Sequence, residues 1–254
     1  MKKPRLGIFK LTSCDGCQLS ILNLEEELLR VVELFSLSFF PVASDKELSG
    51  YFDLALIEGS ISEPRQREEV ISVRERSRYL ITIGACATSG GLQALKNWAV
   101  LESFKKSVYP DPALIESLST STPVSDHVYV DFEIWGCPVT GDALSETLAC
   151  FLLDKRPTIP QYSLCMECKR KAIPCILVSE GEPCLGPITR AGCGALCPSF
   201  SRACYGCFGP RDDANIDSLM RWFEKSGYSG TERQRLLDTM NTYAYRRVHI
   251  EKKD

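Results

Sequence analysis

The chain has 254 residues, of which 44% are hydrophobic, and it carries 13 cysteines and a formal net charge of -3. This length suits one well-buried domain and a smaller second one. The interspersed charges argue against nucleic acid as a partner, so we expect proteins or small molecules. No stretch has the ~18 apolar residues of a membrane span, and the N-terminus lacks a signal peptide's apolar region. We therefore expect a cytoplasmic protein with no membrane span, where clustered cysteines more often bind metal than form disulfides.

Apolar runs and amphipathic patterns alternate along the first 156 residues. The expected strands cover 5–11, 37–42, 54–60, 79–83 and 128–134, and the expected helices cover 19–32, 64–77, 92–98 and 141–153. Residues 101–126 are rich in turn residues and are interpreted as a loop or excursion. Strands that alternate with helices predict a parallel sheet covered on both faces. We expect an α/β domain over 1–156 with a flavodoxin-like doubly wound sheet.

Four cysteines come directly after expected strands. Cys14 and Cys17 follow the first strand, Cys86 follows the fourth and Cys137 follows the last. In an open parallel sheet, ligands bind in the crevice beyond the carboxyl ends of the strands. The four thiols can therefore meet at one point and form one metal site.

Each of these cysteines alone has a simpler interpretation. Cys14-Asp-Gly-Cys17 before a helix is also the pattern of a thioredoxin-like redox pair. Cys86 or Cys137 alone would most often be a small buried core residue. Equivalent positions after three strands favour a single four-thiolate site.

The other cysteines, apart from Cys150 in an apolar helix, gather in a segment over 157–213 that is rich in Gly and Pro. This segment has too few aliphatic side chains to fold by apolar burial alone, so its thiols must be tied together. Cys150 is interpreted as core. The other eight make two further four-thiolate sites, whose division the spacing leaves open: Cys165, Cys168, Cys175, Cys184, Cys193, Cys197, Cys204 and Cys207.

Four thiols per site fit zinc and iron–sulfur clusters equally well. A zinc ribbon usually pairs two CxxC motifs about 15–20 residues apart. Here the motifs ending at Cys168 and starting at Cys204 are farther apart and enclose four more cysteines. Cys197-Pro198 is similar to the pattern of bacterial ferredoxins. The segment is therefore expected to be a small ferredoxin-like domain with two 4Fe-4S clusters.

Several motifs together resemble a known family. They are Leu11-Thr-Ser-Cys14-Asp-Gly-Cys17-Gln, Ile57-Glu58-Gly59-Ser60, Gly84-Ala-Cys86-Ala, Gly136-Cys137-Pro138 and Pro183-Cys184-Leu-Gly-Pro-Ile-Thr-Arg-Ala-Gly-Cys193. Over nearly the whole chain, they are similar to the small (delta) subunit of cytoplasmic NiFe hydrogenases of the sulfhydrogenase or NADP-linked soluble type.

The resemblance implies three 4Fe-4S clusters and a role in electron transfer. Hydrogen would be split or formed on a separate NiFe-containing large subunit, so this chain would have no catalytic residue. It would conduct electrons between that site and flavin/NAD(P)-binding or ferredoxin-like subunits. The C-terminal eight cysteines match the ligands of the medial and distal clusters, and the ligands of the proximal cluster are matched by Cys14, Cys17, Cys86 and Cys137.

Other assignments stay open. Deazaflavin-reducing hydrogenases and those coupled to heterodisulfide reductase also resemble this chain, and only their partner subunits separate them. Exported small subunits carry a glutamate before the first CxxC cysteine, where this chain has Ser13, a departure that fits a cytoplasmic branch. The alternative from a different class is a zinc-stabilised scaffold protein without a redox role.

Several other residues carry weaker expectations. Glu58 could line the crevice, although a turn residue is the simpler interpretation. Trp98 and Trp135 are expected in the core rather than near the first cluster. His127 and His249 lack a paired spacing and are interpreted as structural or surface residues. Four basic residues lie in the cysteine-rich segment: Lys169, Arg170, Lys171 and Arg190. They could form a docking patch for an electron partner, although a solvated face is the simpler interpretation.

Residues 214–254 are expected to form C-terminal helices that pack on a neighbouring part of the molecule. Ile216 to Phe223 have helical spacing, and Gly227 ends that helix. Thr231 and Gln234 predict a capping box for a second helix that continues to about residue 243. The charged tail over 246–254 is expected to be loose.

Overall fold

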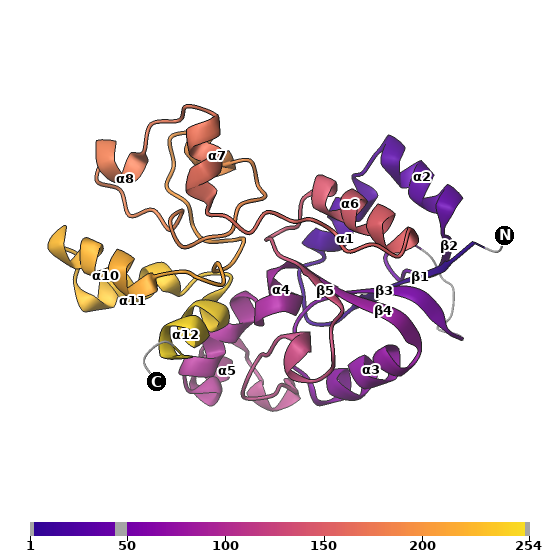
Figure 1. The fold of residues 1–254 in the computed structure, drawn as a ribbon. Coiled ribbons are helices and arrows are strands. Elements are labelled where there is room, and N and C mark those ends of the chain that lie inside the picture. Colours follow the sequence, from indigo (N-terminus) through magenta and orange to yellow (C-terminus); the bar gives the residue numbers. More distant parts are fainter. Residues whose placement is uncertain (1–2, 44–49, 252–254) are drawn as a thin grey trace.

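The computed structural model describes residues 3–43 and 50–251. Within this part of the chain, five parallel strands form a sheet (Figure 1). The strands are β1 (Arg5–Lys10), β2 (Ser36–Phe39), β3 (Phe52–Glu58), β4 (Ser77–Ile83) and β5 (Phe132–Ile134). They lie in the order β2-β1-β3-β4-β5. This is the strand order of flavodoxin-like doubly wound proteins, so the predicted fold class is confirmed.

Helices cover both faces of the sheet (Figure 1). The period of two along β3 explains why both faces are apolar: Leu54 and Leu56 enter one core, and Ala55 and Ile57 enter the other. All four are at most 2% exposed. One face packs against α1 (Gly16–Leu22), α2 (Glu26–Leu34) and α6 (Gly141–Leu152), and the other against α3 (Pro64–Glu75) and α4 (Gly84–Ser89).

The expected strand over 37–42 is shorter, because β2 ends at Phe39 and residues 41–43 form a turn. Two other expected elements in this half differ more. The expected helix over 19–32 is divided into α1 and α2, because Glu25 has a positive φ of 53° that interrupts the helical path. The expected strand over 128–134 shrinks to β5. Asp131, just before it, uses its side chain instead to accept hydrogen bonds from Arg74 and from the backbone nitrogen of Leu80.

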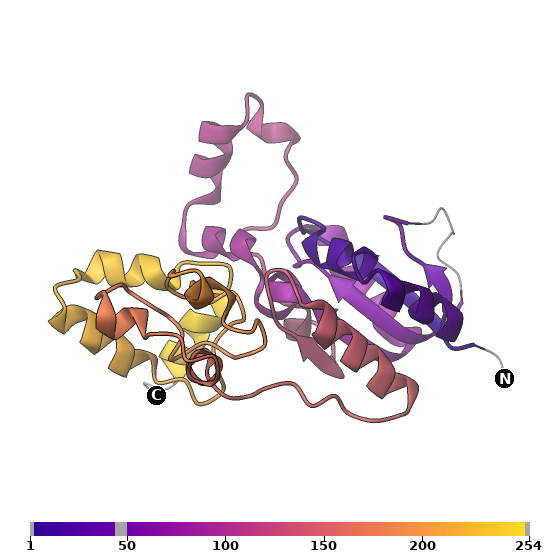
Figure 2. The same cartoon turned by 90° about the horizontal axis from the view of Figure 1, so that it is seen from above.

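The segment expected to be a loop projects from the body of the molecule as an excursion, drawn in magenta in Figure 2. It nevertheless contains regular structure, because Leu101, Phe104 and Val108 have helical spacing that the neighbouring prolines obscure in the sequence. The elements from 92 to 126 are η1 (Leu92–Trp98), α5 (Leu101–Val108), η2 (Pro112–Leu114) and η3 (Val124–Asp126).

The cysteine-rich segment consists of loops around the short helices α7 (Leu164–Arg170), α8 (Ile176–Ser179) and α9 (Leu196–Ser199). The helices α10 (Ile216–Lys225), α11 (Gly230–Leu237) and α12 (Thr242–Glu251) follow. Leu185 and Ile188 of the loops share one apolar core with Phe223 and Tyr245 of these helices. The C-terminal helices therefore supply the aliphatic and aromatic burial that the cysteine-rich loops lack.

The second C-terminal helix begins and ends at other residues than expected. The capping box is formed by Ser229 and Glu232, two residues before the expected pair, and α11 ends at Leu237. The tail from 246 to 251 is helical, not loose, and residues 252–254 lie outside the described part. α12 contacts α4 and η1 and so connects the two halves of the molecule (Figure 1). None of the helices that the structure describes is long and apolar enough to span a membrane.

Candidate metal centres

The structure brings Cys14, Cys17, Cys86 and Cys137 to the carboxyl end of the sheet. Cys14 follows β1, Cys17 lies in the first turn of α1, Cys86 lies in α4 directly after β4, and Cys137 follows β5. The loops after β4 and β5 are joined, because the backbone nitrogen of Ala85 donates to the carbonyl of Gly136 over 2.7 Å. We name these four cysteines the first group.

The thiols of the first group influence one another electrostatically. Burial, reinforced by Cys137, Cys14 and Glu58, raises the pKa of Cys86 to about 11. Burial, followed by Cys14 and Glu58, also raises the pKa of Cys137. The pKa of Cys17 rises for the same reasons: burial first, then Glu58, Cys86 and Cys137. These mutual effects indicate that the four thiols lie near one another, and Cys17, Cys86 and Cys137 would stay protonated at neutral pH as free thiols.

Glu58 is a buried carboxyl group beside these thiols. It is the last residue of β3 and is 2% exposed. Its Oε1 accepts a hydrogen bond from the backbone nitrogen of Cys17 over 3.0 Å, and its Oε2 accepts one from Nε2 of Gln18 over 2.8 Å. The interpretation of Glu58 as a turn residue is therefore wrong, and the signal was its place at the end of a buried apolar strand.

The residues of the first group fit an iron–sulfur cluster. Four cysteine thiols are the usual ligand set of 4Fe-4S clusters. At Gly84, where φ is +83°, the backbone passes so close to the sulfur of Cys17 that any Cβ would clash with it. Buried thiols with raised pKa values become thiolates readily only when a metal replaces the proton. In the part of the chain that the structure describes, no three His, Cys, Asp or Glu side chains are arranged to hold a single metal ion.

A second group consists of Cys165, Cys168, Cys175 and Cys184, around α7 and α8. A Cβ at Gly186 would lie 3.4 Å from the sulfur of Cys184 and 3.5 Å from that of Cys165, so these two sulfurs are neighbours. Burial, followed by Cys184 and Cys175, raises the pKa of Cys165. Burial, followed by the other three thiols of this group, raises the pKa of Cys168 to about 11.

A third group contains Cys193, Cys197 and Cys207. Burial, followed by Cys193, Cys197 and Cys137, raises the pKa of Cys207 to about 12. Burial also raises the pKa of Cys193, and Cys197 raises it further. The chain just after Cys207 packs against the chain just before Cys137, because a Cβ at Gly209 would clash with Cε3 of Trp135. Together with the effect of Cys137 on Cys207, this contact places the third group next to the first.

Cys204 lies between the second and third groups. Its backbone nitrogen donates to the sulfur of Cys184 over 3.2 Å. Burial raises the pKa of its thiol, and Cys184 and Cys207 raise it further. Since the second group already has four cysteines, Cys204 is the natural fourth member of the third group. In space the third group is therefore between the first and the second.

The remaining sequence candidates lie outside the three groups. Cys150 is half-buried on α6. Trp98 is 40% exposed, so its expected place in the core is wrong, whereas Trp135 is half-buried under the guanidinium of Arg190. His127 has a structural contact, with its Nε2 2.7 Å from Oγ1 of Thr122. The side chain of His249 lies outside what the structure describes.

The four basic residues that a docking patch would need are divided between two places. Lys169, Arg170 and Lys171 are exposed, but Arg170 stacks on the ring of Tyr162. Arg190 takes no part in a surface patch, since it donates to Gln161 and Asp212 at the wall of a cavity.

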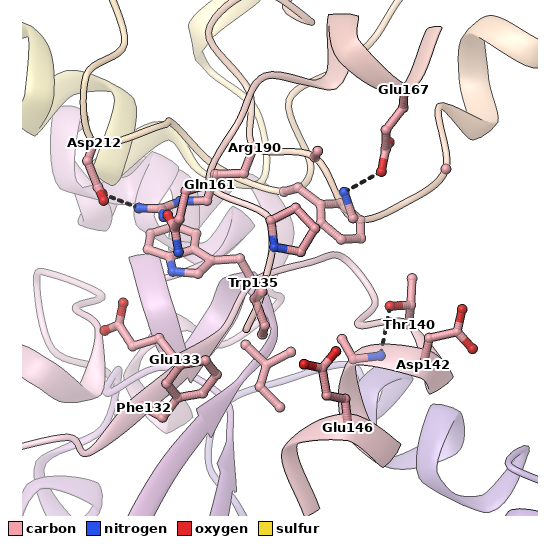
Figure 3. A pocket seen from close by; sticks show the side chains of 18 residues that line it. Phe132, Glu133, Trp135, Thr140, Asp142, Glu146, Gln161, Glu167, Arg190 and Asp212 are labelled. Atoms are coloured by element: carbon pink, nitrogen blue, oxygen red, sulfur yellow. Dashed lines mark hydrogen bonds and ion pairs between the residues drawn. The ribbon is translucent and has the colours of Figure 1, made fainter. Parts of the chain in front are cut away.

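That cavity, of about 540 Å³, lies between β5, α6 and the cysteine-rich segment (Figure 3). Glu167 reaches across its edge, where its carboxylate oxygens accept hydrogen bonds from the backbone nitrogens of Gly192 and Ala195, each over 2.9 Å. Glu167 of the second group's helix therefore holds the loop that carries Cys193 of the third group. This residue was missed in the sequence, where it is simply the residue between Met166 and Cys168.

Comparison with known proteins gives a consistent result. Residues 14–151 match the family described as NADH ubiquinone oxidoreductase, 20 Kd subunit. The chain is 37% identical to sulfhydrogenase 2 subunit delta of Pyrococcus furiosus, over 85% of this chain and 90% of the relative. It is 29% identical to NAD-reducing hydrogenase HoxS subunit delta of Cupriavidus necator, over 58% of this chain and 77% of the relative.

A solved structure is similar over much of the chain. It is a chain of an NAD+-reducing [NiFe]-hydrogenase in the H2-reduced state, with a TM-score of 0.58 and 29% identity. The match covers 63% of this chain and 96% of the other.

Proposed function

Because this chain belongs to the NADH ubiquinone oxidoreductase 20 Kd subunit family, and its relatives include hydrogenase subunits, we propose that it is the electron-transfer small subunit of a NiFe hydrogenase. The active NiFe site would be on a partner large subunit. The chain itself contributes no acid, base or nucleophile to the splitting of hydrogen. Its part in the reaction is to accept and pass on electrons.

The single observation that carries this proposal is the row of three cysteine groups. The first group lies at the carboxyl end of the sheet, the third group lies beside it through Cys137 and Cys207, and the second group lies beyond, through Cys184 and Cys204. Twelve of the thirteen cysteines belong to this row. A scaffold protein would need its metal sites only for stability, with no reason to align them across two domains.

We propose that each group holds one 4Fe-4S cluster. The first group would hold the proximal cluster, the third the medial and the second the distal. Clusters of this type supply reversible one-electron oxidation and reduction when they are bound. The protein's own contribution is to exclude water by burial and to direct backbone N–H groups toward the sulfurs, as the nitrogen of Gly206 is directed toward Cys204 over 3.4 Å.

The thioredoxin-like alternative finds no support at Cys17. Reactive cysteines in redox motifs have lowered pKa values. Burial and the charge of Glu58 instead raise the pKa of Cys17, which suits a metal ligand that is deprotonated by its metal.

The relatives' names support a partner subunit that accepts electrons from this chain. A flavin/NAD(P)-binding or ferredoxin-like subunit would receive electrons from the second group, whose Cys175 is exposed. Partners of the deazaflavin or heterodisulfide-reductase type are the competing choice. A cytoplasmic location is part of this proposal, and the thirteen cysteines, none of which forms a disulfide, support it.

The test is to purify the native protein anaerobically with its copurifying subunits. We expect a brown sample with about twelve iron atoms per chain and a broad visible band that bleaches under hydrogen. Bound zinc without iron would overturn the proposal. A brown sample that bleaches with dithionite but never with hydrogen would keep the iron–sulfur sites and exclude the hydrogenase partner.

A further inference from the structure

Asn241, the residue before α12, has an unusual set of hydrogen bonds. An Asn in this position ordinarily accepts a hydrogen bond from the first turn of its own helix. Asn215, directly before α10, does so by accepting from the backbone nitrogen of Ser218 over 2.9 Å. The side chain of Asn241 instead points away from α12, and it is fully buried at 0% exposure.

The amide of Asn241 bridges the two halves of the molecule. Its Nδ2 donates to the carbonyl oxygens of Gly206 and Cys207, each over 2.9 Å. Its Oδ1 accepts a hydrogen bond from Oγ of Ser89 over 2.6 Å. Ser89 is the last residue of α4, the helix that carries Cys86. One side chain therefore connects a cysteine helix of the first group with the Cys204–Cys207 turn of the third group.

The orientation of this amide is determined by its partners. Two carbonyl oxygens can only accept hydrogen bonds, so the NH2 group must face them, and the oxygen must face the hydroxyl of Ser89. Both N–H groups of the amide are paired in a buried place, where an unpaired donor is costly, and the hydroxyl of Ser89 also lies 2.9 Å from the carbonyl oxygen of Ala85 in its own helix. The partners therefore fix one orientation of the amide between the two halves.

Neighbouring residues hold the same turn in place. The hydroxyl of Tyr245, on α12, is 3.2 Å from the carbonyl oxygen of Gly206. Gly206 has a φ of +75°, and a Cβ there would lie 2.6 Å from that hydroxyl. The carbonyl of Gly206 is held by Asn241 and Tyr245, and its backbone nitrogen donates to the sulfur of Cys204.

We propose that Asn241 is a positioning residue for electron transfer between the first and third groups. It sets the separation and the relative orientation of the two sites, and it directs an N–H group of the Cys204–Cys207 turn toward a ligand sulfur. This inference rests on the proposed iron–sulfur sites. A purely structural role would give stability to the C-terminal helices without any effect on the coupling of the two sites.

The test compares three variants in the assembled complex. N241A removes the bridge, S89A disconnects it from α4 while both carbonyl contacts remain, and N215A is a matched control that removes an ordinary helix cap. In each, iron and sulfide are measured, and the reduced protein is examined by electron paramagnetic resonance for the splitting that arises from spin coupling between adjacent clusters. A redox titration of the third group's cluster is recorded in parallel.

We expect N241A and S89A to retain iron and to show a loss or change of the splitting, with a lower potential of the third cluster in N241A. N215A should keep the splitting and the potential of the unmodified protein. If N241A fails to bind iron, the inference is tested by the splitting in S89A alone. An unchanged splitting in S89A then overturns the inference. Unchanged splitting and potential in an iron-loaded N241A would also overturn it. An unmodified protein without iron would overturn the proposed function itself.

Discussion

Replacing Glu58 by glutamine tests the electrostatics of the first group. In the native protein, a carboxyl group that is 2% exposed accepts hydrogen bonds from the backbone of Cys17 and from Gln18. Oε1 of Gln18 is buried without a partner. In E58Q, rotation of the Gln18 amide would let that oxygen accept from the new NH2 group. The substitution therefore changes the charge of the site with little change in packing.

The size of the effect follows from Coulomb's law. A unit charge about 5–8 Å from a redox centre, at an effective dielectric constant of ~20, contributes about 2–3 kcal/mol. For one electron this corresponds to a potential change of about 100 mV. Reduction adds negative charge to the site, so removal of the carboxylate favours the reduced form. We expect E58Q to raise the reduction potential of the proximal cluster by about 100 mV.

The assay is a redox titration of the assembled protein, followed by electron paramagnetic resonance. E69Q is the matched control, because Glu69 lies on the exposed face of α3, and it should leave the potential unchanged. The free energy of unfolding of E58Q should stay within about 1 kcal/mol of the native value. An unchanged or lowered potential in a folded, iron-loaded E58Q would refute the reasoning that a buried negative charge acts on this site.

Three further predictions concern ligands, packing and pH. C86A should lose about four of about twelve iron atoms per chain, whereas C150A should lose none; equal iron contents of the two variants in a metal analysis would contradict the grouping. Y245F removes a fully buried hydroxyl that lies 2.9 Å from Oγ1 of Thr189 and 3.2 Å from the carbonyl oxygen of Gly206. It should lower the free energy of unfolding by about 1–2 kcal/mol in a denaturant titration. An unchanged free energy of unfolding would mean that water replaces both contacts. Burial raises the pKa of Glu133 above its ordinary value of 4.5, so the folded state binds the proton more tightly than the unfolded state, and stability falls as the pH rises from 4.5 through the raised pKa. E133Q should therefore be more stable than the native protein at pH 8, with the difference shrinking toward pH 4.5, and a difference that is independent of pH in thermal unfolding would contradict this.

The sequence predicts most of the sheet and the place of the first group. Apolar runs such as 54–58 are long and continuous because buried parallel strands need apolar residues on both faces. A cysteine shortly after such a run must lie at the carboxyl edge, which is why the sequence alone predicts that Cys14, Cys86 and Cys137 lie together. The strand order is also predictable, since short connections and right-handed crossovers leave few alternative topologies.

The features that the sequence did not predict depend on contacts between distant residues. Ser89 and Asn241 are 152 residues apart in the chain, and neither stands out from other polar residues near helix ends. Glu167 holds a loop 25 to 28 residues further along through two backbone nitrogens. The spacing of residues along the sequence does not indicate which distant residues will be hydrogen-bond partners. The break between α1 and α2 was missed for another reason, because the positive φ falls on Glu25 rather than on glycine.

The spatial order of the cysteine groups explains why the chain needs its C-terminal helices. The chain leaves the first group at Cys137, builds the second group at the far end, and only then returns to place the third group in between. The returning loop has few apolar residues of its own, so nothing local holds Cys207 near Cys137. α12 and the residue before it supply that constraint, since Tyr245 and Asn241 make hydrogen bonds to the returning turn while α12 packs on α4. The helices after residue 214 thus hold the third group in place beside the first, although they carry no cysteine.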